Sequence, residues 1–206
     1  MCPTPSPLNV TLRDDVLPAD RPPLERILRE SKYFREDEIP VGLELVDDRL
    51  ARGDASHYRF VVAAQGDRTV GYCCYGLIAC TVHSYDIYWI AVDPAFQRSG
   101  VGRRLMAAAE EKIRSAGGRR IYVETSSKAL YESTRKFYAK CGYKEDAILA
   151  DFYAPGDSKV IMAKSLEPPP EPAKDAAKEP GKDAEKDRAK DSPKESGRDA
   201  GKPDGK

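Results

Sequence analysis

The order of strand and helix signals in the middle of the chain constrains the fold most strongly. Segments 58–64, 69–80 and 85–93 are rich in β-branched and aromatic residues, which is typical of strands, and the turn QGDR separates the first two. An amphipathic helix pattern follows over 100–118, and a further strand signal follows at 119–126. A run of strands, followed by a helix between two strands, predicts a mixed sheet with flanking helices.

The signals on either side extend this pattern into one domain of class α/β (α+β). Further strand signals lie at 9–14, 143–153 and 158–166, and further helical spacing lies at 24–34, 38–53 and 129–142. After Leu166 alanine is the only apolar residue, and such a segment cannot bury enough surface to offset the entropy of ordering it. We therefore expect a flexible N-terminus at 1–8, a folded domain at 9–166 and a disordered tail at 167–206.

Composition excludes several classes of protein. The 34 basic and 34 acidic residues give a formal net charge of zero, which argues against a general nucleic-acid binder. No apolar run approaches the ~18 residues of a membrane span. The start MCPTPSPLNV lacks the basic and apolar regions of a signal peptide, so we expect a cytoplasmic protein with reduced thiols.

The stretch DPAFQRSGVGRRLM, residues 93–106, places two glycines between a strand and a helix. The first turn of a helix leaves about four backbone amides unpaired and carries a partial positive charge. Because glycine lets a ligand approach backbone closely, Gly100 and Gly102 predict a turn that binds a phosphate group. Arg98 and Arg103 add positive charge beside this turn.

Two common phosphate-binding motifs do not match this turn. The Walker motif needs a longer loop that ends in Lys-Ser or Lys-Thr, and the turn has neither. The dinucleotide fingerprint needs a glycine three positions after Gly102, where Leu105 stands. On these residues alone, a tight turn that merely begins a helix stays open as the alternative.

Motifs on both sides of the turn resemble the GNAT superfamily of acyl-CoA-dependent N-acetyltransferases. The family pattern Gln/Arg-x-x-Gly-x-Gly/Ala stands here as QRSGVG at 97–102, after VDP at 92–94. The family's second pattern, an aromatic–Tyr pair with Gly and an aromatic residue farther on, stands here as FYAKCGY at 137–143. The resemblance spans 9–166 and implies a mostly antiparallel sheet that is splayed at its centre.

The resemblance also implies the cofactor, acetyl-CoA. In this family the pyrophosphate of coenzyme A lies on the amides of the glycine turn, and the pantetheine arm pairs with the preceding strand as an added strand would. The cofactor-binding residues implied here are Ile90, Ala91, Val92, Gln97, Arg98, Ser99, Gly100, Val101, Gly102 and Arg103. Many members add an Asn that this chain lacks, and Ser126, Ser127 and Tyr131 are the candidates to replace it.

By the same resemblance, Tyr138 is the general acid that protonates the departing thiolate, with a half-buried core tyrosine as the alternative. The acceptor amine has a pKa near ~10.4, so a general base is needed as well. Asp86 is the first candidate base, because its spacing from Gln97 is similar to that of the glutamate base in the histone acetyltransferase branch. Its aromatic and aliphatic strand would also raise its pKa through partial burial.

Each candidate base also has a structural interpretation. Asp86 is alternatively a structural carboxylate that pairs with a neighbouring strand. Glu124 is the second candidate base, and strand alternation places it on the same face as Tyr122; it alternatively orients a nearby loop.

A metal site is not expected. Cys73 and Cys74 are adjacent on a strand and point to opposite faces, so they do not ligate one ion easily, and no Cys-x-x-Cys pair is present. With Cys80 and His83 they are interpreted as packed thiols and a loop histidine.

The function that we predict is transfer of an acetyl group from acetyl-CoA to a primary amine, directly in a ternary complex. The acceptor is a small molecule or a peptide, and we expect a monomer or homodimer with no nucleic-acid or membrane partner. The alternatives are a non-catalytic CoA-binding regulatory domain and a protein lysine or N-terminal acetyltransferase.

Overall fold

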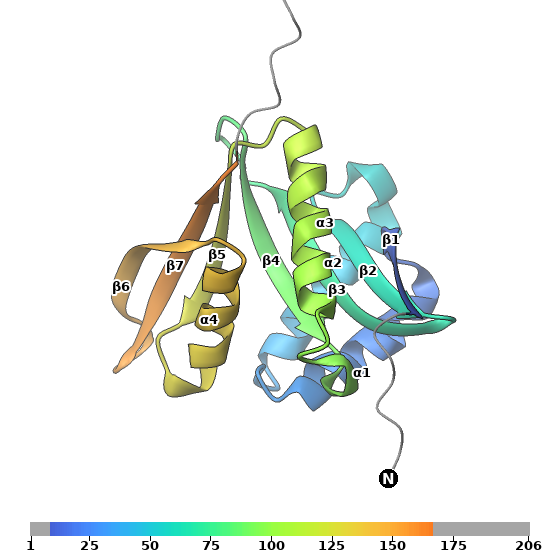
Figure 1. The fold of residues 1–206 in the computed structure, drawn as a ribbon, viewed down its shortest axis with the longest axis horizontal. Coiled ribbons are helices and arrows are strands. Elements are labelled where there is room, and N and C mark those ends of the chain that lie inside the picture. The colour runs from blue at the N-terminus through green and yellow to red at the C-terminus, as the bar shows by residue number, and fades with distance from the viewer. Residues whose placement is uncertain (1–8, 167–206) are drawn as a thin grey trace, which may run out of the picture. The chain divides into compact units, whose positions relative to one another are not determined.

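A computed structural model describes residues 9–166, which form a seven-stranded sheet flanked by helices (Figure 1). The expectations for 1–8 and 167–206 lie outside the described residues. The strands are β1 (Val10–Asp14), β2 (Arg59–Gln65), β3 (Arg68–Leu77), β4 (Ser84–Val92), β5 (Arg120–Ser126), β6 (Lys144–Ala154) and β7 (Asp157–Ser165). The helices are α1 (Arg21–Ser31), α2 (Glu38–Arg52), α3 (Val101–Ser115) and α4 (Glu132–Lys140), with short 3-10 turns η2 (Pro18–Asp20), η3 (Gly53–Ala55), η4 (Pro94–Phe96) and η5 (Ala129–Tyr131).

The strand order in the sheet is β1-β2-β3-β4-β5-β7-β6. All neighbours are antiparallel except β4 and β5, which run parallel because α3 carries the chain back between them. The prediction of a mixed, mostly antiparallel sheet is therefore confirmed.

The sheet opens between β4 and β5. These two strands pair only from Ser84 to Ile87, opposite 120–123. Beyond that point β4 pairs only with β3, β5 pairs only with β7, and the two strands diverge (Figure 1). The expected splay at the centre of the sheet is confirmed, and within residues 9–166 one edge of 88–92 has no strand partner.

A β-bulge lies where the splay begins. Cys74 pairs with Trp89 and Tyr75 pairs with Ile87, so Tyr88 is the extra residue on β4. Tyr88 and Trp89 consequently both pack against the core on the side of α1 and α2. Bulges re-aim side chains in this way and are common beside active sites.

Two buried cores cover the two faces of the sheet. Leu105 and Ile113 of α3 pack with Ile121 of β5 on one face, and Leu24 of α1 and Val46 of α2 pack on the other. Cys73 belongs to the first core and Cys74 to the second, which confirms that their side chains point to opposite faces.

Several element boundaries differ from the sequence-based ranges. The first helix begins at Arg21 instead of residue 24, because Pro22 and Pro23 lie in its first turn, where a missing N–H costs nothing. Strand β3 ends at Leu77, ahead of Cys80, whose φ of 61° places it in a turn. The expected helix at 129–142 is divided into η5 and α4.

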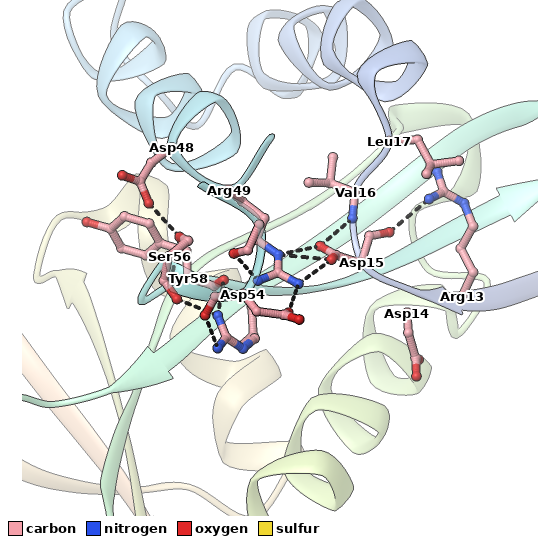
Figure 2. Close-up of polar contacts among 12 residues, drawn as sticks. Arg13, Asp14, Asp15, Val16, Leu17, Asp48, Arg49, Asp54, Ser56 and Tyr58 are labelled. Carbon is pink, nitrogen blue, oxygen red and sulfur yellow. Dashed lines mark hydrogen bonds and ion pairs between the residues drawn. The ribbon is translucent and has the colours of Figure 1, made fainter. Parts of the chain in front are cut away.

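The end of α2 is fixed to the start of the domain by Arg49, which is buried (Figure 2). Its Nε donates to both carboxylate oxygens of Asp15 at 2.9 Å, and its guanidinium also bonds Asp54 and the carbonyl of Gly53. Burial acts to raise the pKa of Asp15, but the Arg49 guanidinium and the Val16 amide together hold that pKa below its ordinary value. This cluster holds the C-terminal end of α2 against the segment that follows β1.

Replacing Arg49 by methionine should lower the free energy of unfolding by about 1–3 kcal/mol, because Asp15 loses its main cation. The folded pKa of Asp15 lies below its unfolded value, so this contribution is present near neutral pH and is lost as pH falls through the folded pKa. Denaturant titrations should show this loss of unfolding free energy near pH 7 and a smaller loss in acid. Arg52→Met, which removes an exposed pair with Asp48, is the control and should cost under about 0.5 kcal/mol. Equal losses of stability in Arg49→Met and Arg52→Met would contradict a stabilising role for the Arg49–Asp15 pair.

Candidate active site

The end of β4 is held by a buried carboxylate, Asp93. Its Oδ2 accepts hydrogen bonds from Arg26 of α1 and Arg68 of β3, each at 2.8 Å, and its Oδ1 accepts one from the Ala95 amide at 2.9 Å. Burial opposes these bonds, yet they hold the pKa of Asp93 below its usual value. The carboxylate thus fixes the direction in which the chain leaves β4 for the glycine turn.

The glycine turn ends in a helix start without a side-chain cap. Gly100 is the N-cap of α3 with φ of 90°, a conformation that favours glycine, and Arg98 is also left-handed with φ of 60°. The Arg104 amide makes the first helical bond, to the Gly100 carbonyl at 3.1 Å. The amides of 100–103 therefore stand at the positive end of a 15-residue helix.

The small size of Gly102 has a packing role. A Cβ built there would lie 3.3 Å from the Phe137 ring and 3.8 Å from a Val92 methyl group. Its small size lets α4 pack directly against the first turn of α3. The sequence motif, which allows glycine or alanine at this position, indicates a small residue but does not reveal this contact.

The remaining expected cofactor residues lie together beside this helix start. Ile90 and Val92 pack toward the α3 core, and Ala91 is buried on the opposite face. The Gln97 amide group donates to the Val92 carbonyl at 3.4 Å, and the Ser99 hydroxyl bonds the Phe96 carbonyl. An uncapped helix start next to an open strand edge suits an anionic ligand that also carries amide groups.

Tyr138 lies on the α3 side of the sheet. It is buried in the same core as Cys73, which pairs with Ile90 across β3 and β4, and its ring centroid is 5.4 Å from that of Phe137. Burial raises the pKa of Tyr138, with smaller contributions from Cys73 and Cys141. The phenol therefore stays protonated near neutral pH and is available as a hydrogen-bond donor.

Asp86 and Glu124 lie on the other face of the sheet. Ile121 and Val123 are buried toward α3, so Tyr122 and Glu124 face the opposite way, as strand alternation predicts. Asp86 pairs with Tyr122 across β4 and β5. Burial and, to a smaller extent, the Glu124 carboxylate raise the pKa of Asp86 to about 6, against the opposing effect of Lys159. The structure thus brings the two candidate bases together and places Tyr138 across the sheet from them.

Lys159 of β7 contacts both candidate bases electrostatically, and sequence analysis did not identify it. Its Nζ lies 2.6 Å from Glu124 Oε2 and 3.7 Å from the ring centroid of Phe152. An irregular segment of β6, between Leu149 and Ala154, brings this ring over the lysine, and Asp151 within it has φ of 52°. Sequence periodicity carries no signal for such an interruption of the strand pairing.

The three candidates to replace the family Asn all bond other parts of the protein. The Tyr131 hydroxyl donates to the Tyr33 carbonyl at 2.6 Å, which ties the segment between α1 and α2 to η5. Ser126 bonds the Asp157 carboxylate, and the Ser127 hydroxyl accepts from the Ser158 amide at 2.9 Å. Tyr131 is the one that spans the two parts of the splayed sheet.

Neither a metal cluster nor a membrane helix is found in the part of the chain that the structure describes. Residues 9–166 hold no group of three His, Cys, Asp or Glu side chains arranged to bind a metal ion. None of the helices within that range has the length and apolar character needed to cross a bilayer.

Comparison with known proteins gives consistent matches. A family model described as an acetyltransferase (GNAT) domain matches residues 56–145. A putative GNAT-family acetyltransferase from Desulfovibrio desulfuricans shares 41% identity at a TM-score of 0.74, covering 76% of this chain and 98% of that one. The uncharacterized N-acetyltransferase YvbK of Bacillus subtilis is 30% identical over 110 residues, which are 53% of this chain and 65% of that protein, just under two thirds of its length.

A more distant solved structure shares the fold. An aminoglycoside 6'-N-acetyltransferase complexed with coenzyme A has 22% identity and a TM-score of 0.61, covering 78% of this chain and 98% of that one.

Replacing Asp86 by asparagine should stabilise the protein above about pH 6. The folded pKa of Asp86 is about 6 and its unfolded value is 3.8, so the folded state loses stability as pH rises through that window. The variant should gain on the order of 1 kcal/mol near neutral pH, because the side chain is only half-buried, and nothing in strong acid. Thermal unfolding from about pH 3 to pH 8 measures this; a variant less stable than wild type near neutral pH would indicate a structural carboxylate.

Proposed function

Because the chain belongs to the GNAT superfamily of acetyltransferases, we propose that it moves an acetyl group from acetyl-CoA to a primary amine by direct transfer in a ternary complex. The observation that carries the proposal is the open edge of β4 beside the uncapped start of α3, with Tyr138 and Asp86 on the two faces of the sheet. Bound acetyl-CoA supplies the acetyl group and leaves as the free thiol.

The chain's own groups suit such a cofactor. At Gly100 an added Cβ would meet nothing within 4 Å, so the space in front of the helix start is free for an anion. The amides of 100–103 would hold the pyrophosphate, and Arg98 and Arg103 would add positive charge beside them. The unpaired edge of 88–92 would bond the amides of the pantetheine arm.

Asp86 is proposed as the general base. Within residues 9–166 its carboxylate has no hydrogen-bonded or ion-paired partner, so it is free to bind the ammonium of an acceptor. A pKa near 6 leaves it mostly ionised at pH 7 while bringing its basicity closer to that of an amine than an ordinary aspartate has. Glu124 already pairs with Lys159, which makes it the weaker candidate base.

Tyr138 is proposed as the general acid. Its buried, protonated hydroxyl would donate a hydrogen bond that strengthens as negative charge develops on the departing sulfur. A phenol has a pKa of about 10 and a thiol about 8.5, and burial raises the phenol further, so the bond need not pass the proton completely.

The acceptor is proposed to be a cationic primary amine. Lys159 balances the charge of Glu124, and within residues 9–166 the Asp86 carboxylate beside them has no ion-pair partner, so it can attract an ammonium group. Small-molecule amines and peptide amines both fit this chemistry.

Replacing Tyr138 by phenylalanine should lower kcat by about 100-fold and leave the Kd for CoA within about twofold, because the variant lacks only the donated hydroxyl. Thiol release from acetyl-CoA with a panel of free amines and peptides measures both the activity and its acceptor class. Tyr75→Phe, in the same core, is the matched control and should retain activity. Tight CoA binding without turnover on any amine would favour a regulatory CoA-binding domain.

Replacing Lys159 by methionine should move the acidic limb of the pH profile of kcat/KM to higher pH. The lysine lowers the pKa of Asp86 and also neutralises Glu124, which raises it, so both effects of the substitution have the same sign. Lys128→Met, whose ammonium lies 3.1 Å from Asp157, is the matched control and should leave the limb in place. An unmoved limb in Lys159→Met would argue against Asp86 as the titrating base.

A further inference from the structure

One ion pair joins the two parts of the splayed sheet. Lys164 of β7 places its Nζ 2.6 Å from Oε2 of Glu110 on α3, and the two side chains are 25% and 10% exposed. Among the ion pairs within residues 9–166, only this one links the part built from β1–β4 and α1–α3 to the part built from β5–β7 and α4. It lies on the face of the sheet that α3 and α4 cover (Figure 1).

Lys164 also reaches the end of the helix that carries Tyr138. Its Nζ donates to the carbonyl of Cys141, the C-cap of α4, at 2.9 Å. The amides of Cys141 and Tyr143 in turn donate to the Tyr138 carbonyl, at 2.9 and 3.1 Å. Glu110 is therefore connected to the backbone of Tyr138 through one lysine and one turn.

The same pair lies against the aromatic packing around Tyr138. The Lys164 ammonium is 5.7 Å from the Tyr143 ring centroid, and the centroids of Tyr143 and Tyr138 are 5.9 Å apart. Tyr143 is buried, and burial together with the Glu110 carboxylate raises its pKa. The pair thus restrains both the backbone of Tyr138 and one side of its ring.

The ion pair lies level with the β4–β5 ladder, because Lys164 pairs with Ile121, which pairs with Tyr85. Past Ile87 these two strands no longer pair, so the distance from Tyr138 to the open edge of β4 depends on side chains. Phe137 against Gly102 provides apolar contact there, but apolar contacts allow sliding that a directional, charge-assisted bond does not.

We propose that the Glu110–Lys164 ion pair is a positioning element that holds Tyr138 at the open edge of β4 for proton donation. The proposal rests on the proposed function of Tyr138. Both residues act through Tyr138 and neither contacts the reacting groups, so their removal should affect the step in which the thiolate leaves more than it affects cofactor binding.

Lys164→Met should lower kcat about tenfold or more with the Kd for CoA changed by less than about twofold, because the proposed cofactor contacts lie at the start of α3 and along β4. Lys164→Arg, which preserves the charge and the donors, should restore most of the activity. Glu110→Gln tests the pair from its other side in case Lys164→Met folds poorly. Glu111→Gln is the matched control, because Glu111 lies next along α3 in an exposed pair with Arg114.

A double-mutant cycle with Tyr138→Phe decides whether the pair acts through Tyr138. In the Tyr138→Phe background, Lys164→Met should add less than about a twofold further loss of kcat, because the group being positioned is already gone. Losses that multiply independently would overturn the proposal, as would a folded Lys164→Met variant with unchanged kcat.

Failure of the proposed function would be recognised separately. If wild type releases no thiol with any amine, acetyl transfer fails, and the pair is then tested by hydrogen exchange of the amides at Cys141 and Tyr143. Faster exchange in Lys164→Met than in Glu111→Gln would support positioning, and equal exchange would overturn it.

Discussion

The arrangement of this domain depends on how early the backbone ladder between β4 and β5 ends. Four residue pairs join the two parts of the sheet, and past Ile87 the strands separate. Within residues 9–166, side chains also join the two parts: Tyr131 bonds the Tyr33 carbonyl on one face, and on the other face Phe137 contacts Gly102 and Lys164 pairs with Glu110. The opening that exposes a strand edge to a ligand is therefore held by contacts on both sides of the sheet.

Burial has opposite consequences for the two ionisable groups proposed for chemistry. It raises the pKa of Asp86, which makes a carboxylate more basic, and it raises the pKa of Tyr138, which keeps a phenol protonated. With these shifts, Asp86 is suited to accept a proton on one face of the sheet and Tyr138 to donate one on the other. Ionisation of Asp86 therefore lowers the stability of the folded state, a cost that is common for groups in reactive sites.

Local patterns in the sequence predict most of the fold. The seven strands and four helices follow from alternation, helical spacing and turn residues, and the glycine turn and FYAKCGY at 137–143 identify the family before any coordinates. What cannot be predicted comes from pairing between distant residues. The bulge at Tyr88, the irregular part of β6 that turns Phe152 onto Lys159, and the Glu110–Lys164 pair depend on strand register and helix placement. No local periodicity encodes them.

The hydrogen bonds of Asp93 give the glycine turn a thermodynamic link to α1. Arg26 of α1 and Arg68 of β3 both bond this carboxylate, and Asp93 itself shapes the first residues of the turn. A ligand that binds only the ordered turn stabilises every interaction that the ordered turn requires. Occupancy of the turn would thus make local opening of α1 rarer, so that α1, which is remote from the chemistry, would report whether the cofactor is bound.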